Sequence, residues 1–266
     1  MTIIERDHQT DRFTSAVSEN SPILSVRDLR VHFPIKRGFI VQREVGRVRA
    51  VDGISFDIYP GETLGLVGES GSGKTTVAKA VIQLTKADVG SVKFEGQELV
   101  GLSTPAMRPI RRKIGMVFQD PYGSLNPRMR AGDIIGEPLK VHHLVESREN
   151  YQKQVASLLS TVGLSPAMAE RYPNEFSGGQ RQRLGVARAI AAGPSMLILD
   201  EAVSALDVSI QAQVLNLLQD LQEKYNLAYL FIAHDLSVVR HISHRVAVMY
   251  LGRIVETADS KDMYEN

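Results

Sequence analysis

The sequence of 266 residues contains no cysteine. This absence excludes disulfide bonds, thiolate metal sites, cysteine-ligated iron–sulfur clusters and cysteine nucleophiles. An excess of charge of either sign is also missing, because 31 Lys and Arg residues stand against 30 Asp and Glu residues. No global field therefore favours nucleic acid or an anionic membrane, and any such partner must be recognised locally.

Long apolar runs are missing as well. Runs such as 196–199 and 227–233 are far shorter than the roughly 20 residues that span a bilayer. Residues 1–22 are polar and of mixed charge, without the apolar stretch of a signal peptide. We interpret 1–22 as a flexible N-terminal tail, and we expect that the chain does not cross a membrane by itself.

From Ile23 onward, short apolar runs alternate with segments of helical period. This pattern predicts an α/β fold, with helices covering a parallel sheet. Between Asp120 and Phe176 the alternation fades into turns and helices, which predicts an inserted helical subdomain. The predicted strands are 63–67, 114–118, 196–199, 227–233 and 245–250.

A glycine-rich segment follows the first of these strands. Residues 68–75 match the pattern G-x-x-x-x-G-K-[ST] and run into a predicted helix at 76–84. The glycines let successive backbone N–H groups face a phosphate, and the helix N-terminus adds positive potential. Lys74 is expected to reach the β- and γ-phosphates, and the Thr75 hydroxyl to ligate Mg²⁺. The segment predicts that the chain binds and hydrolyses Mg·ATP, with this set of contacts: Gly68, Glu69, Ser70, Gly71, Ser72, Gly73, Lys74, Thr75 and Thr76.

Two acids follow the apolar run 196–199. Adjacent residues of a strand point to opposite sides, so Asp200 is expected to join the Mg²⁺ shell while Glu201 polarises the attacking water as general base. We expect the strand of these acids to lie beside the strand of the phosphate loop.

Two further polar residues end predicted strands. For His234 we favour a hydrogen bond to the γ-phosphate or to the attacking water over a capping role. The Gln119 amide is expected to meet Mg²⁺ or the water. Together with Lys74 and Glu201, these two complete the predicted catalytic set.

The run Ser177-Gly178-Gly179-Gln180, followed by Arg181-Gln182-Arg183, carries a family resemblance. The chain resembles the ATP-binding subunits of ABC transporters. Read onto this sequence, the resemblance gives the Walker A loop 68–75, the Q-loop Gln119, the signature 177–180, the Walker B Asp200 with catalytic Glu201, the D-loop 204–207 and the switch His234. It implies a P-loop NTPase of the ABC ATPase fold: a RecA-like parallel-sheet core with an N-terminal antiparallel β region and an inserted helical subdomain. The implied ATP-binding domain is 23–266, with the helical subdomain at about 120–180.

The signature also has a physical interpretation. A serine hydroxyl and exposed N–H groups at the start of a helix form an anion site. In the family the signature of one subunit closes over the ATP held by the other subunit's Walker A. The resemblance therefore implies a head-to-tail pair, with nucleotide contacts from Ser177, Gly178, Gly179, Gln180 and the D-loop Asp207.

Three runs, 33–38, 119–128 and 203–209, look like the dipeptide and oligopeptide importers, which also include nickel systems. The resemblance implies an ATPase that energises di- or oligopeptide import, bound peripherally at the cytoplasmic face of the inner cell membrane. Nickel or another small solute is the alternative. The implied partners are a second, non-identical ABC ATPase, two permease subunits whose coupling helices meet the helical subdomain, and indirectly a secreted solute-binding protein. Nucleic acid is not expected, since few aromatic residues accompany the basic residues of 108–113.

Ala202 departs from the family pattern, which usually has proline after the two acids. Because proline would hold Glu201 extended, we expect a less fixed base and lower turnover. An ATP-binding regulatory module with little hydrolysis is therefore a second reading. The adenine-stacking residue stays open, since Val45 holds the expected position and Phe33 or Phe39 are alternatives.

Overall fold

The computed structural model describes residues 21–37 and 43–265. The chain divides into two compact units. We call the described parts of Val17–Arg108 and Tyr229–Asn266 the phosphate-loop unit, and Pro109–Ala228 the helical unit. Of the expected tail, 1–22, only residues 21 and 22 are described, and Phe39 lies outside the described residues.

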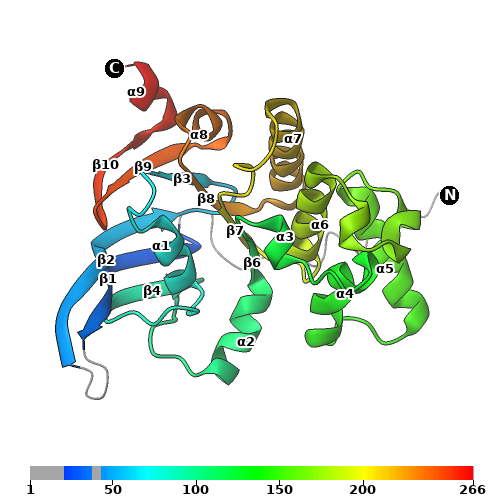
Figure 1. Ribbon diagram of the computed structural model, residues 1–266, viewed down its shortest axis with the longest axis horizontal. Helices are drawn as coiled ribbons and strands as arrows, with labels where there is room; N and C mark the ends of the chain where they lie inside the picture. Colours follow the sequence, from blue (N-terminus) through cyan, green and yellow to red (C-terminus); the bar gives the residue numbers. More distant parts are fainter. Residues whose placement is uncertain (1–20, 38–42, 266) are drawn as a thin grey trace. The chain divides into compact units, whose positions relative to one another are not determined.

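An antiparallel sheet of the order β2-β1-β4-β5 builds one part of the phosphate-loop unit. Its strands are β1 (Leu24–Arg37), β2 (Arg43–Ile58), β4 (Val89–Phe94) and β5 (Gln97–Glu98). In Figure 1, β1 and β2 run as a long paired ribbon beside β4. Leu24, Val26 and Val31 are buried in β1. This sheet confirms the predicted N-terminal antiparallel region.

Parallel strands build the second part of this unit. The strand β3 (Thr63–Val67) pairs in parallel with β8 (Ala228–Ala233) on one edge and with β9 (Arg245–Tyr250) on the other. Every residue of β3 and β8 is buried, as expected when both faces of a parallel sheet are covered. An added Cβ at Gly65 would lie 2.5 Å from Val239 Cγ1 of α8, so this helix packs directly on β3.

The order of these strands corrects one prediction. The strand that ends at Asp200 was expected beside the strand of the phosphate loop. Both edges of β3 are occupied, by β8 and β9, so the expected adjacency is wrong. The remaining elements of the unit are α1 (Lys74–Val81), α8 (Leu236–Ile242), β10 (Arg253–Asp259) and α9 (Ser260–Glu265), and α2 (Thr104–Lys113) crosses the boundary between the units.

The helical unit contains two parallel strands and a group of helices (Figure 1). Helices occupy the predicted insertion, and the long helix α7 buries Val214, Leu217, Leu218 and Leu221, a spacing that forms one apolar stripe. Its elements are β6 (Ile114–Val117), α3 (Pro121–Ser124), α4 (Ala131–Val141), α5 (Arg148–Thr161), η2 (Pro166–Glu170), η3 (Pro173–Glu175), α6 (Gly178–Ile190), β7 (Met196–Asp200) and α7 (Val208–Tyr225). None of the helices in the described ranges combines the length and apolar character of a membrane span.

Candidate functional site

The phosphate loop joins β3 to α1 through a backbone turn that requires glycine. Gly73 caps α1 with a left-handed φ of 111°. A Cβ added there would lie 2.0 Å from the Ala50 carbonyl oxygen of β2, so no other residue fits without moving a strand. The start of α1 is therefore set by backbone packing.

Lys74 is the charged centre of this loop. Its side chain is buried, with 4% exposed. The Lys74 ammonium donates to the carbonyl oxygens of Gly68 at 2.7 Å and Glu69 at 2.9 Å. The cation thus lies within the curve of the loop, where a phosphate oxygen can exchange for a carbonyl.

The rest of the loop is open to a ligand. Glu69, Ser70 and Gly71 are exposed, and a Cβ added at Gly71 would meet no described atom within 4 Å. The first turn of α1, which is described in full, carries no acidic residue, so its N-terminal potential stays positive. Thr75 and Thr76 are half-buried in that turn. The residues present therefore fit a polyphosphate.

His234 follows β8 directly, and the preceding residue, Ala233, is paired with Val67 at the end of β3. The phosphate loop and His234 thus leave neighbouring strands at the same sheet edge. His234 is exposed. The capping role considered for it belongs to Asp235, whose carboxylate accepts from Ser237 N at 2.8 Å and Ser237 Oγ at 2.7 Å. These hydrogen bonds lower the pKa of Asp235.

Gln119 and Glu201 meet in the helical unit. Val117 of β6 pairs with Leu199 of β7, so the residues that follow the two strands emerge together. The Gln119 amide donates to Glu201 Oε2 at 2.7 Å. Asp200, the last residue of β7, is 2% exposed. The acid pair thus divides into a buried member and a partly exposed one.

Glu201 has a backbone conformation that the sequence did not suggest. Its φ is 48°, so Glu201 is not extended where alanine follows it, and the lower turnover expected from Ala202 stays a prediction. The Glu201 carbonyl instead accepts from Ser204 N at 3.1 Å and Ser204 Oγ at 2.9 Å. Because αL is strained for a non-glycine residue, these two bonds and the one from Gln119 define the position of Glu201.

The signature starts α6 with a reciprocal pair of hydrogen bonds. Ser177 Oγ accepts from Gln180 N at 3.3 Å, and Gln180 Oε1 accepts from Ser177 N at 3.0 Å. This capping box follows the pattern S-x-x-Q, a signal in the sequence that motif reasoning overlooked. The D-loop lies against it, since a Cβ added at Gly178 would contact Leu206 at 3.6 Å. Asp207, at the end of the D-loop, is the exposed N-cap residue of α7.

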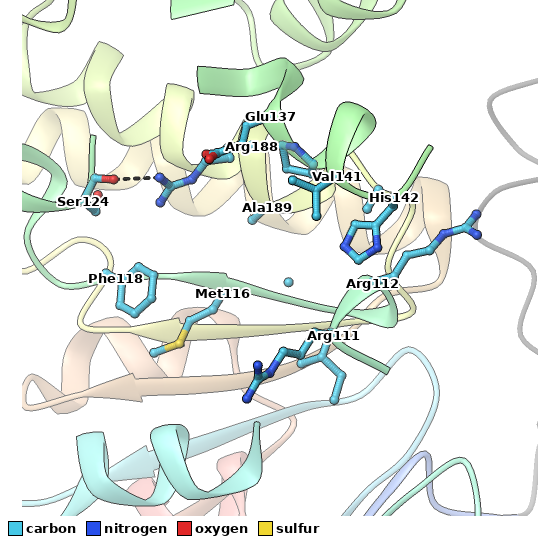
Figure 2. A pocket seen from close by; sticks show the side chains of 14 residues that line it. Arg111, Arg112, Met116, Phe118, Ser124, Glu137, Val141, His142, Arg188 and Ala189 are labelled. Atoms are coloured by element: carbon cyan, nitrogen blue, oxygen red, sulfur yellow. Dashed lines mark hydrogen bonds between the residues drawn. The ribbon is translucent and has the colours of Figure 1, made fainter. Parts of the chain in front are cut away.

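A pocket of about 340 Å³ lies between β6, α4 and α6. Figure 2 shows the Arg188 guanidinium directed at the Ser124 carbonyl, with Glu137 close by; the hydrogen bond measures 2.7 Å. Burial lowers the pKa of Arg188, and Glu137 offsets part of this shift. Arg111 and Arg112 also line the pocket, but Figure 2 shows their guanidinium groups directed away from Glu137. The pocket therefore favours an anionic group with apolar neighbours.

The adenine-stacking candidates lie on the antiparallel sheet. Phe33 pairs with Val48, two residues from Ala50, whose carbonyl contacts the position of Gly73. The Phe33 side chain is 44% exposed and Val45 is 59% exposed. Through its β2 partner Val48, Phe33 of β1 lies closer in register to Ala50 than Val45 does, and it carries an aromatic ring.

Comparison with known proteins adds independent evidence. A family model described as ABC transporter matches residues 51–204. The oligopeptide transport ATP-binding protein AppF of Bacillus subtilis is 55% identical over 245 residues, which cover 92% of this chain and 74% of that protein. The glutathione import ATP-binding protein GsiA is 50% identical in Pectobacterium atrosepticum, over 97% of this chain, and 52% identical in Escherichia coli O157:H7, over 94%. The chain spans only 42% and 40% of these two GsiA proteins.

Solved structures agree on the fold. The dimeric ATP-binding cassette MJ0796, in a post-hydrolysis state bound to ADP and Pi, matches with a TM-score of 0.79 and 26% identity, over 89% of this chain and 98% of that one. CbiO1 from Clostridium perfringens, part of the complex cbiONQ, matches with a TM-score of 0.78 and 24% identity, over 92% and 91%. The second match, at its lower identity, supports the fold alone.

Proposed function

Because this chain belongs to the ABC transporter family and is an ATPase of the ABC fold, we propose that it energises the import of oligopeptides through a membrane permease. The observation that carries the proposal is the 55% identity to AppF across 92% of the chain. Glutathione, itself a short peptide, is the second candidate, on the similarity to GsiA. Nickel is a third outcome of the test.

In this proposal the phosphate loop binds the triphosphate with its backbone N–H groups, and Lys74 carries the positive charge. Thr75 and Asp200, with Gln119, would hold Mg²⁺, whose chemistry is to neutralise the charge that develops on the phosphates. Among the described residues, groups of three or more acid or histidine side chains able to hold a metal are absent. A hydroxyl, one carboxylate and phosphate oxygens are a donor set typical of Mg²⁺ in such enzymes.

Glu201 would act as general base and His234 as a hydrogen-bonding partner of the γ-phosphate or the water. The bond from Gln119 to the Glu201 carboxylate supports a link between these two residues. A base that accepts this bond has one lone pair engaged, so the approach of water must compete with Gln119 or use the other oxygen.

We further propose that catalysis needs a second ATPase subunit, non-identical to this chain. Its signature would close over this chain's phosphate loop, while Ser177, Gly178, Gly179, Gln180 and Asp207 would serve the partner's nucleotide. The dimeric state of MJ0796 supports such pairing. Two permease subunits would hold the pair at the cytoplasmic face of the membrane, fed by a secreted solute-binding protein.

The pocket of Figure 2 is our proposed docking surface for a cytoplasmic segment of the permease. The Arg188 guanidinium favours an acidic side chain, and the apolar walls, including Met116 and Val141, favour a neighbouring apolar one. Val141 is 43% exposed. Val141→Asp should reduce co-purification of the permeases without changing ATP affinity, whereas Val255→Asp, at a 61% exposed site on β10, should change neither.

Phe33 is our proposed adenine platform. Stacking of a base on an aromatic ring contributes about 1–3 kcal/mol. Phe33→Ala should therefore weaken ATP binding by at least about fivefold, while Val45→Ala leaves the affinity unchanged. An equal effect of both substitutions would reject Phe33.

The solute is tested with the complete transporter in proteoliposomes. We expect ATPase activity to rise when binding protein loaded with a mixed oligopeptide is added. Stimulation by glutathione alone, or by nickel alone, would replace the peptide assignment with that solute.

Hydrolysis itself is tested with Glu201→Gln in the same complex. Loss of phosphate release with retained ATP binding is the expected result, because the substitution spares the phosphate loop. Equal rates in both proteins would refute Glu201 as base and favour the regulatory reading.

A further inference from the structure

The turn between β9 and β10 holds the phosphate loop from behind. Gly252 N donates to the Ser72 carbonyl at 3.0 Å. Three residues earlier, in β9, the Met249 carbonyl oxygen lies 2.1 Å from where a Cβ at Gly68 would be. The loop therefore rests on a hairpin that is separated from it by about two-thirds of the chain.

The same turn is fixed to β2. Asp52 N donates to the Gly252 carbonyl at 2.8 Å. The Asp52 carboxylate accepts from Arg253 Nη2 at 2.8 Å and Nε at 3.3 Å. Gly252 has a φ of 82°, and a Cβ there would lie 2.7 Å from the Arg49 carbonyl. Backbone and side-chain hydrogen bonds thus hold the turn between β9 and β10 against β2.

Asp52 is the charged centre of this arrangement. Its side chain is 11% exposed, and Arg49 Nη1 and His32 Nε2 approach it to 3.6 and 3.5 Å. The hydrogen bond from Arg253 is the main cause that lowers the pKa of Asp52. Of its cationic neighbours, Arg253 makes the closest contact.

Peptide geometry connects this arrangement to the ligand. The peptide between Ser72 and Gly73 is a rigid plane in which C=O and N–H point in opposite directions. When Gly252 binds the Ser72 carbonyl, the direction of Gly73 N–H is therefore fixed. That N–H belongs to the donors with which a phosphate loop holds its anion.

We propose that Asp52, Gly252 and Arg253, which we name the clasp, are positioning residues for ATP binding. They aim the Gly73 N–H by holding the Ser72 carbonyl, and they do not touch the nucleotide. This inference rests on the proposed role of the phosphate loop. Arg253→Ala loosens the turn and raises the KM for ATP, while kcat at saturating ATP is unchanged.

The test compares two ion pairs, each of which includes an aspartate of β2. In the full chain, Arg253→Ala should weaken ATP binding by about twofold to fivefold, the range of an exposed ion pair, and Arg253→Lys should restore part of the loss. Arg27→Ala is the matched control, because Arg27 pairs with Asp57 at 2.7 Å and is similarly exposed, 53% against 65%. It should lower the melting temperature as much as Arg253→Ala does, with unchanged ATP affinity.

Two results would overturn the clasp: wild-type affinity in Arg253→Ala, or an equal loss in Arg27→Ala, which would reveal a general effect of sheet stability. Gly252→Ala provides a second variant, with a larger expected loss of affinity. The split between KM and kcat is then measured in the assembled transporter, where a lowered kcat at unchanged KM would also count against positioning. A wild-type chain that binds no ATP would refute the role of the phosphate loop itself, which is a different outcome.

Discussion

Two helices of this chain, α1 and α6, begin at glycine-containing motifs, and they hold their first turns in different ways. At α1, the left-handed Gly73 fits beneath a carbonyl of β2. At α6, the side chains of Ser177 and Gln180 close a capping box. The first start is shaped by backbone packing and has no side-chain cap. At the start of α6, the backbone N–H of Gln180 already donates to Ser177 Oγ. An incoming anion must therefore compete with Ser177 for that donor.

The two starts also share a device. Each has a buried cation that binds carbonyls of the preceding segment: Lys74 binds those of Gly68 and Glu69, and Arg181 Nε binds that of Pro173 at 2.6 Å. The comparison teaches that a buried cation alone does not identify an anion site. What distinguishes Lys74 is the open loop around it.

The largest expected effect therefore concerns Lys74. Lys74→Ala should weaken ATP binding by about a hundredfold, because a charge-assisted hydrogen bond contributes up to about 3 kcal/mol. Titration of the purified chain with a fluorescent ATP analogue measures this. Lys79→Ala, at an exposed site of α1, is the control and should bind normally. If Lys74→Ala still bound ATP normally, Lys74 would no longer differ from Arg181 as an anion-binding cation.

The next effect contrasts the glycines. Gly73→Ala should cost roughly 3 kcal/mol of unfolding free energy, because φ is positive and the Cβ meets a backbone oxygen. Gly178→Ala should change it by less than about 1 kcal/mol, since the contact at 3.6 Å is ordinary and alanine favours a helix. Urea unfolding of both variants is the measurement. Similar losses would show that both starts depend on backbone packing.

Ser177→Ala tests the capping box. We expect a loss of about 1 kcal/mol, the usual contribution of an N-cap side chain, and Ser177→Asp should retain most of the stability. Thermal unfolding at neutral pH suffices. No change in Ser177→Ala would mean that the box is dispensable.

The smallest expected effect concerns the start of a third helix, α8. Its N-cap residue, Asp235, can titrate. The folded-state pKa of Asp235 lies below its ordinary value of 3.8, chiefly because of the hydrogen bonds from Ser237. Its extra stabilisation is therefore present above that value and lost as the pH falls through the folded pKa. The difference in melting temperature between wild type and Asp235→Asn should shrink from pH 7 to pH 3. The difference for Ser177→Ala should not, because a hydroxyl does not titrate in this range.

The local sequence pattern predicts much of the fold and part of the candidate site. The strands at 63–67 and 245–250 have the predicted bounds, because each is an apolar run bounded by polar residues. The proximity of Gln119 and Glu201 could be predicted from the sequence, since neighbouring parallel strands end at the same edge of the sheet.

Other features have no local signal. The strand β8 lies beside the strand of the phosphate loop. Its apolar sequence does not predict which strands it pairs with. The positive φ of Glu201 has no signal in the residues around it. Asp52 and Arg253 are paired across the chain, 201 positions apart, which no periodicity shows. The capping box at Ser177, in contrast, was visible as S-x-x-Q.

The pairing of β3 with β8 and β9 has a consequence for synthesis on the ribosome. The residues 68–75 leave the ribosome early, but both neighbours of their strand, and the hairpin behind them, lie beyond residue 227. Chains fold progressively from the N-terminus during translation. A nascent chain of this protein should thus acquire nucleotide affinity only after β8, β9 and β10 have left the ribosome, in one step.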